Sequence, residues 1–394
     1  MKSDFFTYQA QTSEHPLALE ISHATGNYIV DTSGKKYLDF IAGVSANTLG
    51  HNHPKVSQAI KQQVDSYTHV MVYGEFLQQP QIDLCKILVT NTPGAINAVY
   101  LTNSGTEATE GALKLAKRFT GRSEVVAAKN AYHGNTQGAM SVCGSEEKNS
   151  AFRPLIPGTK FIEFNNSIDI QKITKNTAAV ILETIQGSAG FIVPEEEYLK
   201  KVKLQCEHVG ALLILDEIQC GIGRTGTFWG FENYQVIPDI IITGKGLGGG
   251  MPIGAFMAPS SMMNTLSRKP ALGHITTFGG HPVIAAAGLA TVKELTSSNL
   301  IETTLQKELL FRKLLTHPSI LEVRGKGLMI AIMVASPEMA SAIILKCLEK
   351  GLLLFWLLFE GKAIRITPPL TITTTEIEQG CAILLDVINE LDSF

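Results

Sequence analysis

Short apolar segments alternate with helix-like stretches between residues 97 and 258. Five of these segments are rich in Val, Ile, Leu and Ala, and they cover residues 98–101, 124–128, 179–182, 211–215 and 239–242. Nearly continuous apolar strands suit a sheet that is covered on both faces, and the alternation of strands with helices is typical of an open α/β domain. The pattern therefore predicts a mostly parallel sheet in the middle of the chain.

The segments on either side of this region have a different pattern. Residues 26–40 predict a hairpin with Ser33 and Gly34 at its turn, and residues 299–350 predict a helix, a strand and a helix. Residues 351–393 predict a pair of strands and then an amphipathic helix. We therefore expect an N-terminal segment, 1–44, that joins a C-terminal small domain, 296–394, and a large domain over 45–295.

The most apolar run of the chain is LLLFWLLF, residues 352–359. It is less than half as long as a membrane-spanning helix needs to be. We expect it to form a buried strand instead.

Composition and charge narrow the class of protein. With 45% apolar residues, 18% charged residues and a net charge of −3, the chain has a substantial core and no basic field for nucleic acid or an anionic membrane. Its six cysteines contain no CxxC pair, which argues against a disulfide framework or a zinc site. The first residues lack the apolar core of a secretory signal. We expect a cytoplasmic enzyme that uses no metal.

Ligands in open α/β sheets bind beyond the carboxyl ends of the strands, so the polar residues that follow each strand are the candidates. The first strand is followed by NSGTEA. There Ser104, Gly105 and Thr106 would present the free N–H groups of a helix N-terminus to an anion. An ordinary helix cap, with Glu107 or Glu110 in the first turn, explains this segment equally well.

The second and fourth strands also end in candidate residues. AYHG follows the second strand, and its Tyr132 suits stacking on a flat ring, whereas His133 by itself is more typical of a structural histidine. LLILDEIQ ends the fourth strand with Asp216, a pattern that ATPases share. An ATPase would also need a GxxxxGK[ST] loop, which the sequence lacks. The same aspartate could otherwise cap a helix.

The fifth strand leads into TGKGLGGGMPIGA, which contains a formal GxGxxG beginning at Gly244. A dinucleotide site would need a helix next and an acid about twenty residues later. A strand-like run follows instead, and no Asp or Glu occurs between positions 239 and 294. What remains is Lys245, flanked by glycines in an acid-free segment, which favours a depressed amine pKa and a nucleophilic lysine. A solvated surface lysine would explain the charge but not the glycines.

Together these segments resemble the class III aminotransferases, fold-type-I enzymes typified by ornithine, acetylornithine and 4-aminobutyrate aminotransferases. The resemblance runs from YLDFIAGVSANTLGHNHP to RITPPLTI, through NSGTEA, YHG, LDEIQCGIGRTG, TGKGLGGGMPIGA and TTFGGHP in that order. It implies an α/β fold with a mostly parallel seven-stranded sheet in a large domain and a smaller α+β domain from both termini. It also implies the cofactor pyridoxal 5′-phosphate and a homodimer with shared active sites.

The resemblance also assigns roles to single residues. Lys245 would carry the cofactor as a Schiff base and move a proton, and Asp216 would pair with the ring nitrogen. Thr277, in TTFGGHP, would bind the phosphate in the partner's site. The other residues expected to bind the cofactor are Ser104, Gly105, Thr106, Tyr132, His133, Glu183 and Gln219.

Three residues bear on the substrate. Arg365 matches an arginine that holds a substrate carboxylate. The three typical enzymes usually read HGRT and IQGEGG or IQGEAG, whereas this chain has Asn135 in HGNT and Ser188 in IQGSAG. We expect Asn135, Ser188 and Arg365 to bind the substrate. The first two differences from the typical enzymes resemble those of enzymes that use a donor with a terminal (ω) amine, either an ω-amino acid or an amine.

We expect a ping-pong transaminase that passes the amino group to a keto acid such as pyruvate or 2-oxoglutarate. An aminomutase or decarboxylase with the same cofactor and fold is the main alternative. A dinucleotide- or nucleotide-binding enzyme is a further alternative, which the missing acid and the missing phosphate loop disfavour.

Overall fold

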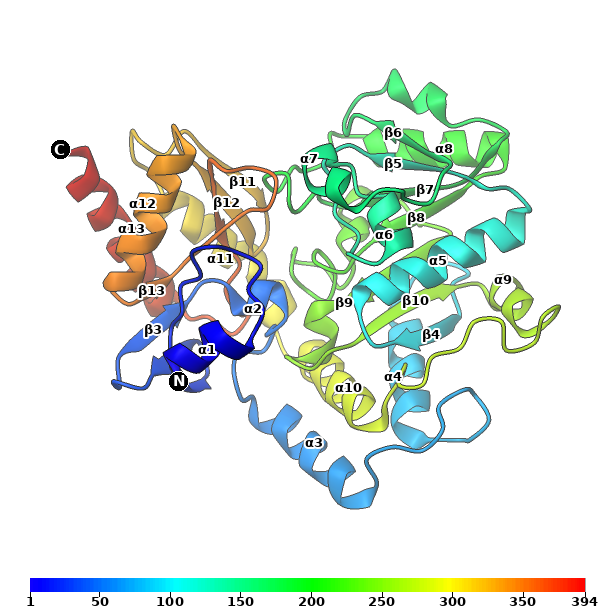
Figure 1. Ribbon diagram of the computed structural model, residues 1–394, viewed down its shortest axis with the longest axis horizontal. Coiled ribbons are helices and arrows are strands. Elements are labelled where there is room, and N and C mark those ends of the chain that lie inside the picture. Colours follow the sequence, from blue (N-terminus) through cyan, green and yellow to red (C-terminus); the bar gives the residue numbers. More distant parts are fainter. Residues whose placement is uncertain (394) are drawn as a thin grey trace.

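A seven-stranded sheet forms the centre of the larger of two lobes in the computed structural model, which describes residues 1–393 (Figure 1). Its order is β4-β10-β9-β8-β7-β5-β6. The strands are β4 (Ala98–Thr102), β5 (Glu124–Ala128), β6 (Thr159–Ile162), β7 (Thr177–Glu183), β8 (Leu212–Asp216), β9 (Ile240–Gly244) and β10 (Gly254–Ala258). Only β10 runs antiparallel to its neighbours, so the carboxyl ends of the other six strands share one edge.

All five strands predicted from the apolar segments lie in this sheet, with bounds that differ by at most two residues. The apolar pattern did not reveal β6, because this strand lies at the edge of the sheet and three of its four residues are partly or fully exposed. A strand that is buried on one side only does not produce a continuous apolar run.

Helices cover both faces of the sheet, as the apolar strands required. On one face, α5 (Gly105–Thr120) packs with one set of alternating strand residues in a separate core cluster. On the other face, the alternate strand residues pack with α8 (Tyr198–Val209), α4 (Gln79–Thr90) and α10 (Pro282–Ser297). The helix α3 (Pro54–Ser66) packs outside α10. The apolar content of the strands therefore follows from burial on both sides.

The smaller lobe contains two four-stranded sheets, with the strand orders β1-β2-β3-β13 and β11-β12-β15-β14. The first contains β1 (Ile21–Thr25), β2 (Tyr28–Asp31), β3 (Lys36–Asp39) and β13 (Leu352–Leu353). The second contains β11 (Glu322–Lys326), β12 (Met329–Met333), β15 (Ala363–Ile366) and β14 (Phe355–Trp356). The lobe also holds α11 (Leu300–Leu314), α12 (Pro337–Glu349) and α13 (Thr374–Asp392).

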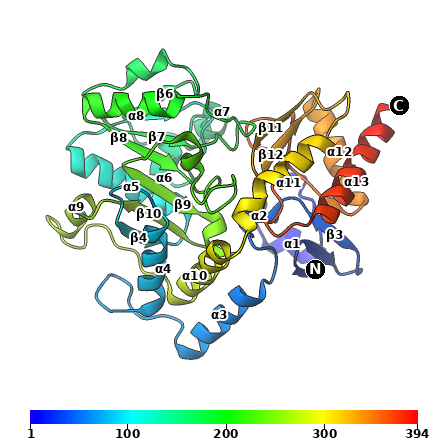
Figure 2. The same ribbon diagram turned by 180° about the vertical axis from the view of Figure 1, so that it is seen from behind.

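This lobe is built from both ends of the chain, as the sequence predicted. β13 pairs in parallel with β3, and Figures 1 and 2 both show the N-terminal strand β3 close to the C-terminal helix α13. The hairpin of β2 and β3 is also confirmed, with the Asp31 side chain accepting the N–H groups of Ser33 and Lys35 across its turn. The division at 1–44, 45–295 and 296–394 stays a prediction from the sequence.

Short elements connect the larger ones. The remaining helices are α1 (Lys2–Tyr8), α2 (Ala42–Ser45), α6 (Gln137–Ser141), α7 (Glu146–Asn149) and α9 (Ser260–Met263). The 3-10 helices are η1 (Ser150–Phe152), η2 (Asp169–Lys172), η3 (Gly230–Tyr234), η4 (Lys245–Gly248) and η5 (Asn264–Ser267). Within residues 1–393, none of the helices combines the length and the apolar character that crossing a bilayer requires.

One sequence prediction about the small lobe was wrong. The run 352–359 does not form a single buried strand, because the chain passes from one sheet to the other within it. Its first residues pair with β3 and are buried, whereas Phe355 is 37% exposed and Leu358 is 48% exposed. The apolar character of the second half therefore needs an explanation other than burial in a sheet.

Gly111 tests the packing of α5 on the sheet. A Cβ at this position would overlap the ring of Phe256, which is fully buried and stacks on Tyr100 with 4.9 Å between the ring centroids. We expect Gly111→Ala to lower the free energy of unfolding in urea by about 1–2 kcal/mol, because overpacking outweighs the gain in helix propensity. Lys114→Ala, an exposed site on the same helix, is the control. A more stable Gly111→Ala protein would contradict this packing.

Candidate active site

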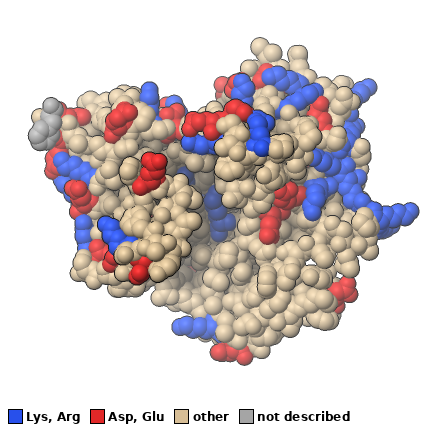
Figure 3. Space-filling model, viewed as in Figure 1, with Lys and Arg blue, Asp and Glu red and all other residues tan. Residues whose placement is uncertain are grey.

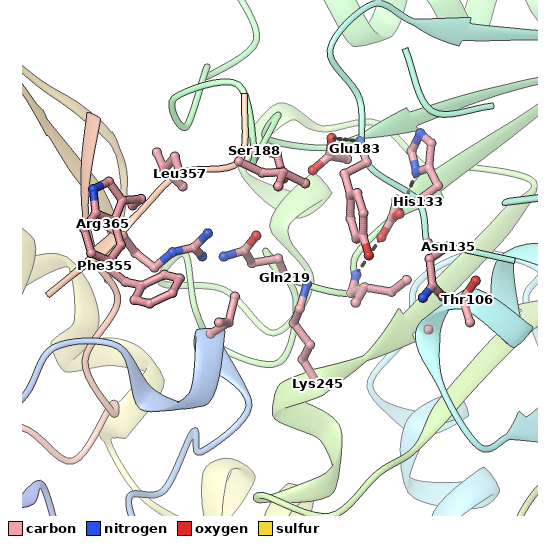
Figure 4. Close-up of a pocket in the computed structure, with 18 residues that line it drawn as sticks. Thr106, His133, Asn135, Glu183, Ser188, Gln219, Lys245, Phe355, Leu357 and Arg365 are labelled. Atoms are coloured by element: carbon pink, nitrogen blue, oxygen red, sulfur yellow. Dashed lines mark hydrogen bonds and ion pairs between the residues drawn. The ribbon is translucent and has the colours of Figure 1, made fainter. Parts of the chain in front are cut away.

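A cavity of about 560 Å³ lies where the carboxyl edge of the seven-stranded sheet faces the small lobe. Figure 3 shows the hollow between the two lobes, with Lys or Arg atoms inside it. The structure brings most of the predicted site residues to its walls. Those that line it are Gly105, Thr106, Tyr132, His133, Asn135, Glu183, Ser188, Asp216, Gln219, Lys245 and Arg365 (Figure 4).

The carboxylate of Asp216 is held in a fixed orientation at the end of β8. His133 donates from Nδ1 to its Oδ2 over 2.7 Å, and the backbone N–H of Ile218 donates to its Oδ1 over 2.9 Å. Both Asp216 and His133 are buried. In the structure, the His133 ring holds the carboxylate of Asp216 in place and also belongs to the cavity lining.

Glu183 occupies the corresponding place at the end of β7. Its Oε1 accepts the N–H of Tyr132 over 3.0 Å, and its Oε2 accepts the N–H of Gly187 over 2.8 Å. Burial raises the pKa of Glu183 to about 7, against the opposing effect of His133, and Asp216 adds to the rise. Glu183 thereby fixes the backbone that carries the Tyr132 ring and the loop that carries Ser188.

Lys245 follows β9 and reaches into the same cavity (Figure 4). Burial lowers its amine pKa, while Asp216 raises it and Arg365 lowers it further. Within residues 1–393, no hydrogen-bond or ion-pair partner lies in range of its Nζ. A partly buried amine with a lowered pKa and no partner has the properties expected of a nucleophilic lysine.

The glycines around Lys245 have a packing role. A Cβ on Gly246 would overlap the hydroxyl of Thr48, and Gly249 has a φ of +57°. Gly244 approaches Gly105 at the start of α5, with 3.5 Å between its ideal Cβ and the Gly105 backbone. These glycines let the loop that carries Lys245 lie against the N-terminal segment and α5. Close packing therefore accounts for the GxGxxG pattern without a bound dinucleotide.

The start of α5 supports both interpretations of NSGTEA. Ser104 caps the helix, because its hydroxyl accepts the N–H of Glu107 over 3.3 Å. Ser104 lies outside the cavity lining, whereas Gly105 and Thr106 line it. The Thr106 hydroxyl lies 2.9 Å from that of Thr136. The helix N-terminus therefore faces the cavity, and the cap is a separate structural feature.

Thr277, like Ser104, is a predicted site residue outside the cavity lining of its own chain. It is exposed on the loop before α10 and does not belong to the lining. Its placement by itself does not assign it a role.

Several apolar lining residues were not predicted from the sequence. They are Val44, Ile218, Phe355, Trp356, Leu357 and Leu358. Four of them belong to the run LLLFWLLF, which precedes β15, the strand of Arg365. Val44 had no signal in the sequence, because its place depends on an unusual backbone conformation.

Val44 lies in a left-handed turn. Ala42, Gly43, Val44 and Ser45 have φ values of 49°, 58°, 61° and 68°. Such values are uncommon for residues other than glycine and are outliers for a β-branched one, at a cost of roughly 1–3 kcal/mol for each strained residue. α2 is therefore not a right-handed helical turn.

Asp39 holds this turn. Its Oδ1 accepts the N–H groups of Ile41 and Ala42 over 2.7 and 2.9 Å, and His51 Nε2 donates to its Oδ2 over 2.7 Å. Thr367 binds from the other side, donating its N–H to the carbonyl of Phe40 and its hydroxyl to that of Ile41. Thr367 follows β15, so the turn is tied to the strand of Arg365.

Known proteins with a similar sequence identify the family to which the chain belongs. Residues 8–388 match the family described as aminotransferase class III. The chain belongs to the class III aminotransferases. This aminotransferase is 39% identical to the acetylornithine aminotransferase of Caldanaerobacter subterraneus, over 93% of each chain. It is also 39% identical to the putrescine aminotransferase of Pectobacterium atrosepticum, over 95% of this chain and 83% of the other.

The fold is shared with solved aminotransferases. The ornithine aminotransferase of Toxoplasma gondii superposes with a TM-score of 0.92 at 30% identity, covering 100% of this chain and 96% of the other. A second structure of that enzyme is described with partial pyridoxal-phosphate occupancy at its active site. The predicted fold and the predicted amino-group transfer are therefore confirmed. The relatives do not favour a mutase or a decarboxylase.

Asp39→Ala tests the turn that positions Val44. It leaves one buried and one partly buried N–H group without an acceptor, so we expect the cofactor-free protein to lose roughly 2–4 kcal/mol of unfolding free energy. Asp39→Asn keeps an acceptor oxygen and should lose less. Urea unfolding of the three proteins measures this, and an alanine variant as stable as the asparagine variant would show that Asp39 does not hold the turn.

Proposed function

We propose that this aminotransferase binds pyridoxal 5′-phosphate through Lys245 and transfers an amino group from an ω-amino acid or an amine to a keto acid. The observation that carries the proposal is the unpartnered Nζ of Lys245 in the same cavity as the fixed carboxylate of Asp216 and the start of α5. An amine, a carboxylate and a helix N-terminus match the carbonyl, the ring nitrogen and the phosphate of this cofactor.

The residues present fit the cofactor. Asp216 would hold the ring nitrogen in its protonated form, and Tyr132 would lie against the ring. Gln219 would contact the phenolic oxygen, and Gly105 and Thr106 would bind the phosphate. Pyridoxal phosphate, when bound, supplies an electron sink for the substrate carbon that loses a proton.

Three residues of the chain would transfer the proton, orient Asp216 and bind the substrate. Lys245 accepts and returns a proton at Nζ, and its lowered pKa increases the fraction of free base. His133 keeps the carboxylate of Asp216 oriented through the bond at Nδ1. Arg365 binds a substrate carboxylate; burial lowers its pKa to about 10, which still leaves it a cation at neutral pH.

The relatives differ in the substrate that they are named for, which includes acetylornithine, putrescine and an aminoadipate semialdehyde. In this chain Asn135 and Ser188 occupy positions where the typical family sequences carry an arginine and a glutamate. Losing these charges changes which substrates bind without removing Lys245 or Asp216. We therefore propose a donor with a terminal amine, with pyruvate or 2-oxoglutarate as the acceptor.

The proposal includes a homodimer in which Thr277 binds the phosphate in the partner's site. Exposed apolar side chains gather on two segments: residues 64–82, which run from the end of α3 to the start of α4, and the loop 272–278. They are Val64, Val70, Met71, Tyr73, Phe76, Leu77, Ile82, Leu272, Ile275 and Phe278. His69 joins the two segments, with its ring 4.8 Å from that of Phe278. An exposed apolar patch of this kind is typical of a subunit interface.

We also propose a cytoplasmic location. The six cysteines are free thiols in the structure, which fits a reducing compartment.

Lys245→Ala tests the central assignment. We expect it to remove the visible absorbance of the lysine-bound cofactor and to lower the transamination rate by ~10³-fold or more, because both the attachment point and the proton carrier are lost. Lys148→Ala, which changes an exposed lysine, should retain colour and rate. A coloured, active Lys245→Ala enzyme would rule out the assignment.

A mixed dimer tests the role of Thr277. Lys245→Ala and Thr277→Asp subunits carrying different tags are expressed together, and the heterodimer is isolated through both tags. If Thr277 serves the partner's site, the heterodimer has one intact site and should show about half of the wild-type activity, far above either parent. A heterodimer no more active than its parents would place Thr277 in another role.

A further inference from the structure

The carboxylate of Glu110 joins α5 to the start of α6. Its Oε1 accepts three donors, which are the Thr136 hydroxyl over 2.6 Å and the N–H groups of Gly138 and Ala139 over 2.9 and 3.1 Å. Both N–H groups lie in the first turn of α6, whose N-cap residue, Thr136, makes no cap bond with its own side chain. Glu110 therefore caps α6 from a different helix, with charge-assisted hydrogen bonds.

The bond to Thr136 continues as far as the cavity. The Thr136 hydroxyl lies 2.9 Å from Thr106 Oγ1, and the Thr136 N–H donates to the same oxygen over 3.3 Å. Thr106 and Asn135, the residue before Thr136, line the same side of the cavity (Figure 4). Glu110 lies outside that lining, one helical turn beyond Thr106 on α5. It therefore acts on the cavity through Thr136 and not by contact.

Two glycines let these side chains pack directly against the loop backbone. A Cβ on Gly138 would overlap both oxygens of the Glu110 carboxylate, and a Cβ on Gly134 would overlap the hydroxyl of Thr106. Gly134 also has a φ of +131°, in the region that favours glycine. Neither the carboxylate nor the hydroxyl can turn toward the loop, so the bonds at Thr136 fix both side chains in one orientation.

The ring-nitrogen end of the cavity is held by other bonds. The Thr109 hydroxyl donates to the carbonyl of His133 over 2.9 Å, and the N–H of His133 donates to Cys143 Sγ over 3.1 Å. These bonds, with the one from His133 to Asp216, do not pass through Glu110 or Thr136. A change at Glu110 should therefore disturb the Thr106 side of the cavity and leave Asp216 in place.

We infer that Glu110 is a positioning residue for the phosphate end of the cofactor, an inference that rests on the proposed function. Through Thr136 it holds Thr106 at the start of α5 and keeps the loop of Asn135 against that helix end. Without the carboxylate, two N–H groups of α6 and the Thr136 hydroxyl lose their acceptor, and the anion site at Thr106 loses its fixed wall. Lys245 keeps its own surroundings.

Two forms of the cofactor test the inference, because pyridoxal lacks the phosphate of pyridoxal 5′-phosphate. Each is titrated into the full-length cofactor-free protein, and Kd is read from the visible absorbance of the lysine-bound form. We expect Glu110→Ala to raise the Kd of pyridoxal phosphate by roughly tenfold or more and to leave that of pyridoxal within about twofold. Glu110→Gln keeps an oxygen for the three donors and should recover most of the affinity. Glu147→Ala, which removes an exposed acid of α7, is the control.

A second substitution tests the route through Thr136. Thr136→Val removes the hydroxyl while Glu110 still caps α6, so it should weaken pyridoxal phosphate and spare pyridoxal. Because both side chains act through one hydrogen bond, the double variant Glu110→Ala/Thr136→Val should be hardly weaker than Glu110→Ala. Thr136→Ser keeps the hydroxyl and should bind pyridoxal phosphate like the wild type. Thr136→Val also tests the inference if Glu110→Ala does not fold.

The outcomes separate the two proposals. Equal loss of both cofactor forms in the alanine variant would make Glu110 a purely structural residue, and additive effects in the double variant would remove the route through Thr136. Either result, or an unchanged Kd for pyridoxal phosphate, overturns the inference. A wild-type protein that binds neither form contradicts the proposed function itself. Selective loss of pyridoxal phosphate, with recovery in Glu110→Gln, supports both.

Discussion

Two acidic side chains lie next to each other at the ends of β7 and β8, and the site depends on keeping them there. Glu183 and Asp216 are paired in register across the two strands. Like charges this close repel, but His133 and three backbone N–H groups compensate, and burial raises the pKa of Glu183 to about 7. The register of these parallel strands places both carboxylates at the cavity, where they oppose the lowering of the Lys245 pKa by burial.

The small lobe completes this edge of the sheet from two distant parts of the chain. β3 and β13 pair near the base of the left-handed turn, and Thr367 ties that turn to β15. Val44 and Arg365 therefore reach the cavity through one connected set of backbone bonds. The strain in the turn persists because Asp39 satisfies the N–H groups that the left-handed backbone leaves free.

Much of the catalytic edge could be predicted because it follows from local rules. Nearly continuous apolar strands indicated a sheet covered on both faces, and the residues after each strand included Tyr132, Glu183, Asp216 and Lys245. The run 352–359 was misinterpreted because apolar content does not distinguish a sheet core from a cavity wall. The first half is buried beside β3, whereas Phe355 and Leu358 are partly exposed to the cavity.

Residue order alone specified the α/β class and the family, and it made Lys245 the candidate for the nucleophile, since these depend on strand periodicity and short motifs. Tertiary structure decided which side chains surround Arg365 and Val44 in the cavity. Arg365 is recognisable in the sequence, but its position among the apolar lining residues follows only from the fold. Val44 enters the cavity only because Asp39 and Thr367, 328 positions apart in the sequence, hold one strained turn between them.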